Sequence, residues 1–185
     1  MSIAEEALLE MAALLDELRL PYMLIGGVAV GLWGEARATL DVDFTIWVEP
    51  EQFESTIQTL AARLSVRTAQ PLESARQTRV LPVRASNGVF VDLLFAAWPI
   101  EKQAIERAVL RNIAGAEVRL TALDYLLYLK LISERPKDQA DADALLRRHR
   151  GRVDLSWLEA ELTALAESVA QPELLLRFQR LLSGE

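Results

Sequence analysis

Residues 25–44 read IGGVAVGLWGEARATLDVDF, and this stretch contains the features that decide the predicted fold. The glycine pair Gly26-Gly27 follows a short apolar run over residues 22–25, which predicts a strand that turns tightly into a helix reaching about Trp33. From residue 41 to residue 48, apolar and polar side chains alternate as in a β-strand with one buried face. A strand, a glycine turn, a helix and a second strand are therefore predicted in that order.

Apolar periodicity predicts further helices and strands on both sides of this stretch. Helices are expected over residues 3–18, from 49 to about 64, 99–108, 121–133 and 137–148, with two more near the C-terminus. Strands are expected over residues 80–84, 89–96 and 117–120, with a loop or connector over 65–76. Pro82 predicts an edge strand, Asn87-Gly88 a hairpin turn, and Thr121-x-x-Asp124 a variant capping box. We expect an α+β protein with its core in residues 1–120 and a helical lobe, residues 121–185, packed on it.

Composition excludes several kinds of site. The 185 residues contain no cysteine and a single histidine, His149, which excludes disulfides, cysteine nucleophiles and most histidine-based metal sites. We expect His149 to be solvated and the protein to be cytoplasmic without membrane contact, since no apolar run approaches the roughly 20 residues of a membrane span. The net charge of −7 disfavours tight non-specific binding of a polynucleotide. The arginines at 67, 76, 79 and 84 form either a solvated face or a local acceptor-binding patch.

Acidic residues on two predicted strands point to a metal site. Residues two apart on a strand share a face, so Asp41 and Asp43 project together. Asp92 is the single charge within the apolar strand 89–95, where an unpaired carboxylate is unfavourable. Such carboxylates are typical ligands of Mg²⁺, and a pair of ions about 3.5 to 4 Å apart can assist an in-line displacement. Asp92 is a third ligand or a base that takes a proton from an attacking hydroxyl.

The glycine pair and a lysine are candidate phosphate contacts. Gly26 and Gly27 let the backbone approach a triphosphate closely. Lys130 lies within an apolar helix face, where a lysine either extends to solvent or meets an anion. Asp138 either orients Lys130, touches the metal or caps the helix that begins there.

Each of these residues also has a purely structural interpretation. Asp41 and Asp43 could face solvent at the start of a strand, and the glycines could form only a turn. Asp92 could form a structural salt bridge with an arginine or lysine. We favour the chemical interpretation because the motifs occur together.

The combination resembles a known family. The motifs resemble those of the minimal nucleotidyltransferases of the polymerase-beta superfamily, in particular the AbiEii-type group. They are Gly26-Gly27, the run Arg37-x-Thr39-x-Asp41-x-Asp43, Asp92 and the segment from Lys130 through Asp141. The resemblance extends from about Tyr22 to Asp143. Many members of the superfamily have Gly-Ser where this chain has Gly26-Gly27, so the serine hydroxyl contact to phosphate is missing here.

The resemblance implies a mixed sheet flanked by helices and Mg²⁺ held by Asp41, Asp43 and Asp92. It implies that an NTP lies against the glycine pair, with Arg37, Thr39, Lys130 and Asp138 as further nucleotide-site residues. The acceptor would be an RNA such as tRNA, or a protein, and the group includes toxins that have a cognate antitoxin. Two other hypotheses stay open, namely an inactive nucleotide-binding or partner-binding module and an antibiotic-modifying nucleotidyltransferase.

Overall fold

The structure is a computed structural model that describes residues 1–34, 39 and 41–183. The chain divides into two compact units. The first comprises Met1–Ala29 with Arg37–Thr121, and the second comprises Val30–Ala36 with Ala122–Glu185. Within the described ranges, no helix is both long and apolar enough to cross a membrane.

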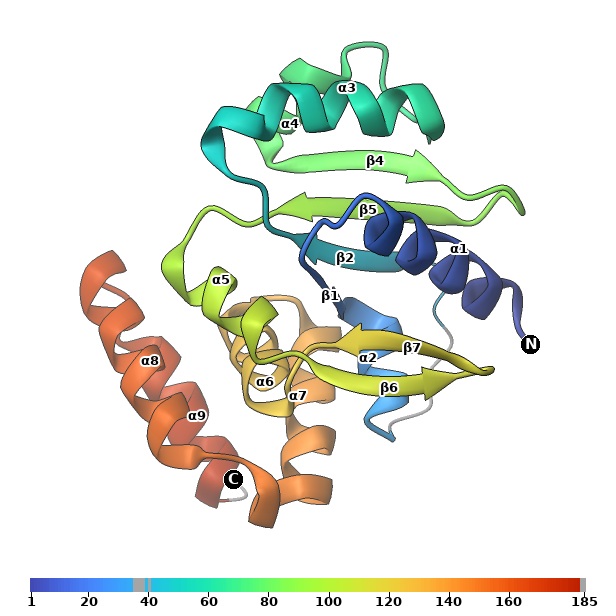
Figure 1. Cartoon of the computed structure of the whole chain (residues 1–185). Coiled ribbons are helices and arrows are strands. Elements are labelled where there is room, and N and C mark those ends of the chain that lie inside the picture. Colours follow the sequence, from blue (N-terminus) through green and yellow to red (C-terminus); the bar gives the residue numbers. More distant parts are fainter. Residues whose placement is uncertain (35–38, 40, 184–185) are drawn as a thin grey trace. The chain divides into compact units, whose positions relative to one another are not determined.

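A seven-stranded mixed sheet is the centre of the first unit (Figure 1). The strand order is β3-β4-β5-β2-β1-β7-β6. The pairs β2–β5 and β1–β7 are parallel, and the remaining neighbours are antiparallel. The strands are β1 (Tyr22–Ile25), β2 (Val42–Ile46), β3 (Ser65–Val66), β4 (Val80–Arg84), β5 (Phe90–Phe95), β6 (Val109–Ile113) and β7 (Ala116–Leu120). This is the α+β architecture with a mixed sheet that the sequence predicts.

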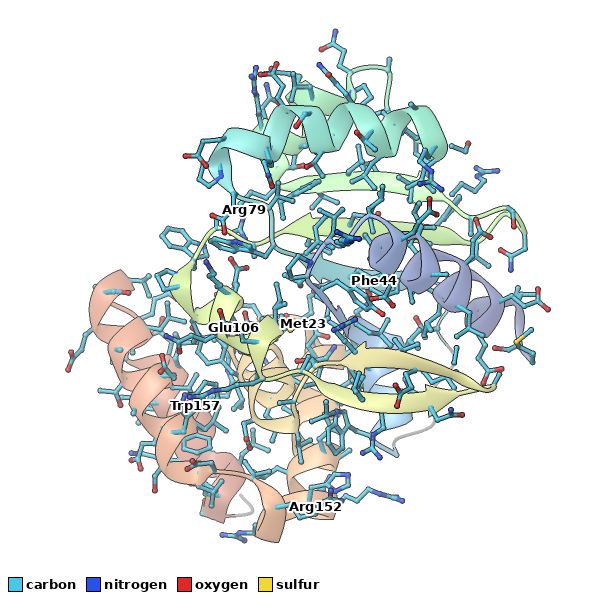
Figure 2. All side chains as sticks on the ribbon, viewed as in Figure 1. Met23, Phe44, Arg79, Glu106, Arg152 and Trp157 are labelled. Carbon is cyan, nitrogen blue, oxygen red and sulfur yellow. The ribbon has the colours of Figure 1, made fainter. Side chains whose placement is uncertain are left out.

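Alternation along β2 and β5 separates a buried face of the sheet from a more open one. Val42, Phe44 and Ile46 are fully buried, and the register pairs them with buried residues of β5. Phe44, labelled in Figure 2, lies on β2. Its ring packs edge-on against that of Tyr22 of β1, with ring centroids 5.5 Å apart. Helix α1 (Ile3–Glu17) contacts β2, and its inner residues Leu8, Met11 and Leu15 are fully buried. This apolar layer fixes the register that places the intervening residues on the other face.

The segment 65–76, predicted as a connector, contains a strand and a helix instead. After the short helices η1 (Pro50–Gln52) and α3 (Phe53–Arg63), the chain forms β3 and then α4 (Pro71–Thr78). The prediction of Pro82 in an edge strand is also wrong, because β4 lies between β3 and β5. Proline lacks an N–H, but the Pro82 carbonyl still accepts a hydrogen bond from the Arg67 N–H at 2.8 Å. A two-residue strand is too short to give a periodic signal in the sequence.

The last part of the first unit holds one strand more than predicted. Helix α5 (Pro99–Glu106) is followed by a hairpin in which β6 pairs antiparallel with the predicted strand β7. Three of the five residues of β6 are exposed, so the strand lacks the apolar alternation on which the sequence analysis depends.

Helices form the second unit, together with the end of α2 (Gly26–Leu32). They are α6 (Leu123–Ile132), α7 (Pro136–His149), η2 (Arg150–Arg152), α8 (Leu155–Val169) and α9 (Glu173–Ser183). Helix α6 contacts α7, α8 and α9, which explains why it is apolar on most sides. Arg177 of α9 donates hydrogen bonds to the carbonyls of Leu131 and Ser133 and thereby satisfies the C-terminal end of α6.

Candidate functional site

Two of the predicted acidic residues are direct neighbours on the sheet. Asp43 of β2 and Asp92 of β5 are register partners across a parallel pair. Side chains of register partners leave the sheet on the same face, and adjacent strands lie about 4.8 Å apart. Both residues are half-buried, while their neighbours Val42, Phe44, Val91 and Leu93 are fully buried on the opposite face. The fold therefore brings together two carboxylates that are 49 positions apart in the chain.

Asp41 extends this acidic group. It is exposed, directly precedes β2, and shares the face of Asp43 by strand alternation. Burial raises the pKa of the Asp92 carboxyl, the nearby Arg67 guanidinium lowers it, and the negative charge of Asp41 raises it, with a net upward shift. The electrostatic effect of Asp41 on Asp92 indicates that the two carboxylates are close enough to repel each other.

Gly26 packs directly against the carboxylate of Asp43. It follows Ile25, the register partner of Asp43 on β1, and has a φ of +70°. A Cβ atom at position 26 would lie 2.0 Å from Oδ2 of Asp43. Both the left-handed backbone and this close approach require glycine. Gly27 is the next residue of α2 and is buried.

Arg67, which the sequence analysis named only as one of a group of arginines, is the partner of Asp92. Its guanidinium lies 3.6 Å from Oδ1 of Asp92 and 3.9 Å from the centroid of the Phe90 ring. Asp92 thus has the arginine partner of the structural interpretation, although its side chain is 40% exposed and faces the same side as Asp43. The arginine-rich composition of residues 67–84 is the sequence signal that points to Arg67. The position of Arg67 beside Asp92 depends on strand β3, which the sequence analysis did not predict.

The donor chemistry of these residues suits Mg²⁺. In the part of the chain that the structure describes, no group of three or more His, Cys, Asp or Glu side chains is closed around a common point as a metal site. Asp92 instead faces Arg67. The three acidic residues nevertheless offer hard oxygen ligands on one face of the sheet. The residues fit a divalent cation if the Asp92 carboxylate exchanges Arg67 for the ion.

Lys130 of α6 lies in a buried ion cluster within the second unit. Its ammonium contacts Oδ1 of Asp138 and lies 3.0 Å from Oδ2 of Asp141, and all three side chains are at least nine-tenths buried. Ser133 donates a 2.7 Å hydrogen bond to Asp138, and Arg135 lies 3.0 Å from it. Burial raises the pKa of Asp138, but the hydrogen bonds from Lys130 and Ser133 outweigh this effect and hold it below its usual value. Asp138 therefore pairs with Lys130, while the predicted phosphate contact of both residues stays a prediction.

The remaining predicted residues have separate outcomes. The Thr39 hydroxyl lies 3.4 Å from the Asp41 carbonyl and can donate to it, whereas Arg37 lies outside the described residues. His149 is buried, not solvated, with Nε2 2.7 Å from the Trp33 carbonyl. The predicted capping box is wrong, because Ala122 is the N-cap of α6 and the Asp124 carboxylate accepts from the Asp154 N–H instead.

Comparison with solved structures identifies the fold. An antigenic nucleotidyltransferase-like protein from Paracoccidioides brasiliensis is 18% identical, with 94% of this chain and 92% of that chain covered and a TM-score of 0.57. The antibiotic-resistance factor ANT(2'')-Ia is 16% identical, with coverages of 91% and 94% and a TM-score of 0.58. The lincosamide antibiotic adenylyltransferase LnuA is 15% identical, with coverages of 78% and 98% and a TM-score of 0.53.

The chain has a nucleotidyltransferase fold. Its sequence matches no protein-family model and no curated protein. The solved structures establish the fold, while the resemblance to the polymerase-beta superfamily and to its AbiEii-type group rests on the sequence motifs.

Proposed function

We propose that this protein is a Mg²⁺-dependent nucleotidyltransferase that moves an NMP group from an NTP to a hydroxyl of an RNA, such as tRNA, or of a protein. The observation that carries the proposal is the register pair Asp43–Asp92, with Asp41 on the same face and Gly26 beside Asp43. The glycine turn packs directly on this acidic pair, since the Asp43 carboxylate lies 2.0 Å from the position of an added Cβ at Gly26. The fold shared with nucleotidyltransferases supports the same reaction class.

The reaction assigns a task to each residue. Asp41 and Asp43 would hold Mg²⁺, with Asp92 as a third ligand or as the base, and up to two bound ions would supply positive charge to the phosphates and to the attacking and leaving oxygens. The acceptor hydroxyl oxygen forms a bond to the α-phosphorus, and the bond from that phosphorus to the bridging oxygen breaks, so that pyrophosphate leaves. The hydroxyl proton passes to Asp92 where this carboxylate acts as the base, and to solvent where it acts as the third ligand. The backbone at Gly26 and Gly27 contacts the triphosphate, with Arg37 and Thr39 as further contacts. A phosphate contact of Lys130 rests on the sequence motifs alone, since its ammonium pairs with Asp138 and Asp141.

Label transfer tests this proposal directly. Purified protein is incubated with each [α-³²P]NTP, Mg²⁺ and either total RNA or lysate, and the products are separated by electrophoresis. We expect one class of acceptor to become labelled and Asp43→Asn to abolish the labelling. Glu106→Gln, an exposed acid at the end of α5, is the matched control and should transfer normally. Undiminished transfer by Asp43→Asn would rule out this site.

A specific observation favours one second candidate. Several of the similar structures are antibiotic adenylyltransferases, one of them lincomycin-bound and one in complex with adenylyl-2"-tobramycin. A panel of aminoglycosides and lincosamides in the same assay separates the candidates, since drug labelling without RNA or protein labelling identifies an antibiotic-modifying enzyme. Calorimetric binding of NTP with Mg²⁺, but no transfer to any component, identifies an inactive nucleotide-binding module. A role as the toxin of a toxin–antitoxin pair, with a cognate antitoxin, rests on the AbiEii-type motifs and predicts growth arrest on expression.

A further inference from the structure

A pocket lies at the carboxyl ends of the adjacent parallel strands β2 and β5, and we call it the β2–β5 pocket. Its lining includes Trp47, which follows β2, and Ala96 and Ala97, which follow β5. The pocket has a volume of about 460 Å³, which is within the range of small-molecule sites. In open α/β sheets, ligands bind outside the carboxyl ends of the strands. Trp47 lies four residues after Asp43, about 13 Å along an extended chain, so the pocket is separate from the acidic group.

Aromatic side chains form much of the pocket wall. Phe95, at the end of β5, is 3% exposed and packs edge-on against Phe53 of α3, with ring centroids 5.1 Å apart. The indole N–H of Trp47 donates a 2.9 Å hydrogen bond to the Glu49 carboxylate, and the Lys102 ammonium lies 4.4 Å from the centroid of the indole ring. These contacts hold the indole in place. The wall is therefore preformed and suits an apolar, ring-sized group.

Arg79 is fixed at the same pocket by contacts with β5 and α5. It is the C-cap of α4 and has a φ of +60°, a left-handed backbone that is unfavourable for a residue with a Cβ atom (Figure 2). Its Nε donates to the Phe95 carbonyl at 2.9 Å, and one terminal nitrogen lies 2.6 and 2.7 Å from the two carboxylate oxygens of Glu101. Glu101 in turn accepts hydrogen bonds from the N–H groups of Ala97 and Trp98. Among the described residues, the other terminal nitrogen of Arg79 has no hydrogen-bond partner, so it can donate to a ligand.

Arg76 of α4 supplies a second cation that a ligand can engage. Its guanidinium lies 3.3 Å from the Glu54 carboxylate, and both side chains are more than half exposed. An exposed ion pair of this kind contributes little stability, so little is lost when a ligand anion replaces Glu54. Two arginines and one glutamate line the pocket, and its charge is thus complementary to an anion although the whole protein carries a net charge of −7.

We propose that the β2–β5 pocket binds a small organic anion whose apolar ring contacts the aromatic wall and whose carboxylate or phosphate pairs with Arg76 and Arg79. This site goes beyond the proposed function, because no residue of its lining belongs to the acidic group or the glycine turn. Guanidinium groups recognise carboxylate and phosphate alike through charge-assisted hydrogen bonds. The volume of the pocket suits one ring system with its acidic group and is too small for a polymer.

Calorimetric titration of the full chain tests this inference. The probes are indole-3-acetate and phenyl phosphate, which distinguish a carboxylate from a phosphate, with indole and acetate as probes that each lack one half. Arg76→Gln should weaken binding of the tighter anion on the order of tenfold, the loss of a charge-assisted hydrogen bond. Ala97→Phe should abolish binding, because the added ring fills the pocket. The matched controls are Arg107→Gln, an exposed arginine after α5, and Ala116→Phe, an exposed position of β7.

The outcomes separate this inference from the proposed function. Binding of a ring-bearing anion that Arg76→Gln and Ala97→Phe reduce, and that the two controls leave unchanged, supports the site. Absence of binding by both anions at millimolar concentration overturns it, as does equal affinity for indole and indole-3-acetate or an equal loss in the controls. Absence of label transfer by a wild-type protein that still binds the probe refutes the proposed function alone.

Discussion

Replacing Gly26 by alanine tests whether the glycine is needed for the position of Asp43. The added Cβ would lie 2.0 Å from Oδ2 of Asp43, whereas ordinary van der Waals contact begins at 3.4 Å. The carboxylate oxygen or the backbone must therefore move by about 1.4 Å, the difference between these two distances. A misplacement of about 1 Å in a catalytic group can lower the rate on the order of 100-fold, so we expect Gly26→Ala to lower label transfer by at least that factor.

The same substitution also affects stability. Alanine at a φ of +70° is strained, and a left-handed conformation costs an L-residue about 1–2 kcal/mol. For a chain of this size each kcal/mol lowers Tm by about 2–4 °C, so we expect a decrease of about 2–8 °C. The protein remains folded at assay temperature, which allows the loss of transfer to be assigned to Asp43.

Gly115→Ala is the matched control for backbone strain. Gly115 has a φ of +93° in the turn between β6 and β7, with no atom within 4 Å of an added Cβ. This variant should lose stability to a similar degree and transfer normally. Thermal melts and initial rates of [α-³²P]NTP transfer measure both effects. Wild-type transfer by Gly26→Ala, or an equal loss in Gly115→Ala, would refute the argument that the glycine makes room for the carboxylate.

Three further predictions concern charged residues. In an NMR titration of carboxyl carbons without metal, the pKa of Asp92 should be above its usual value. Arg67→Met should raise the pKa of Asp92 further, because the variant lacks the guanidinium that lowers it, and an unchanged titration midpoint would contradict this. Lys130→Met should lower the free energy of unfolding in urea by about 3–5 kcal/mol, since Asp138 and Asp141 would stay buried without their cation, and a loss below about 1 kcal/mol would show that the cluster is not stabilising. The pKa of Asp138 is lower in the folded than in the unfolded protein, so the ionised carboxylate stabilises the fold. This stabilisation is fully present at pH values above the unfolded-state pKa of about 3.9 and is lost as the pH falls through the folded-state pKa. Asp138→Asn should therefore flatten the acid dependence of unfolding, and an unchanged slope would exclude Asp138 as its source.

The sequence predicted the elements whose signal is local. Alternation over residues 41–48 identified β2, and Asn87-Gly88 identified the hairpin of β4 and β5. The apolar spacing of the last 65 residues predicted α6 to α9. The elements that were missed, β3 and β6, are short or exposed, so no periodic burial marks them, and α4 lay within the same predicted connector.

The candidate site likewise has features that the sequence predicts and features that depend on contacts between distant parts of the chain. The sequence singles out Asp92 because a carboxylate in an apolar strand is unusual. It singles out Asp41 and Asp43 because residues two positions apart on a strand share a face. The alignment of Asp43 with Asp92 could not be predicted, because it depends on β5 pairing parallel with β2, a contact between strands that are distant in the chain. Arg67 and His149 show the same limit, since the partners of both are set by packing, namely Asp92 and the Trp33 carbonyl.

Residue order alone determined most of the helical and extended segments, with the exception of β3, α4 and β6, and which side chains can carry charge chemistry, because periodicity and residue type act over a few positions. Tertiary structure decided which of those side chains meet. Strand pairing aligned Asp43 with Asp92 and brought Arg67 and Arg84 to Phe90, and helix packing enclosed Lys130 between two aspartates. The physical reason is that register is fixed by burial of the apolar layer on one face, and a shift of one residue would turn every site side chain to the opposite face.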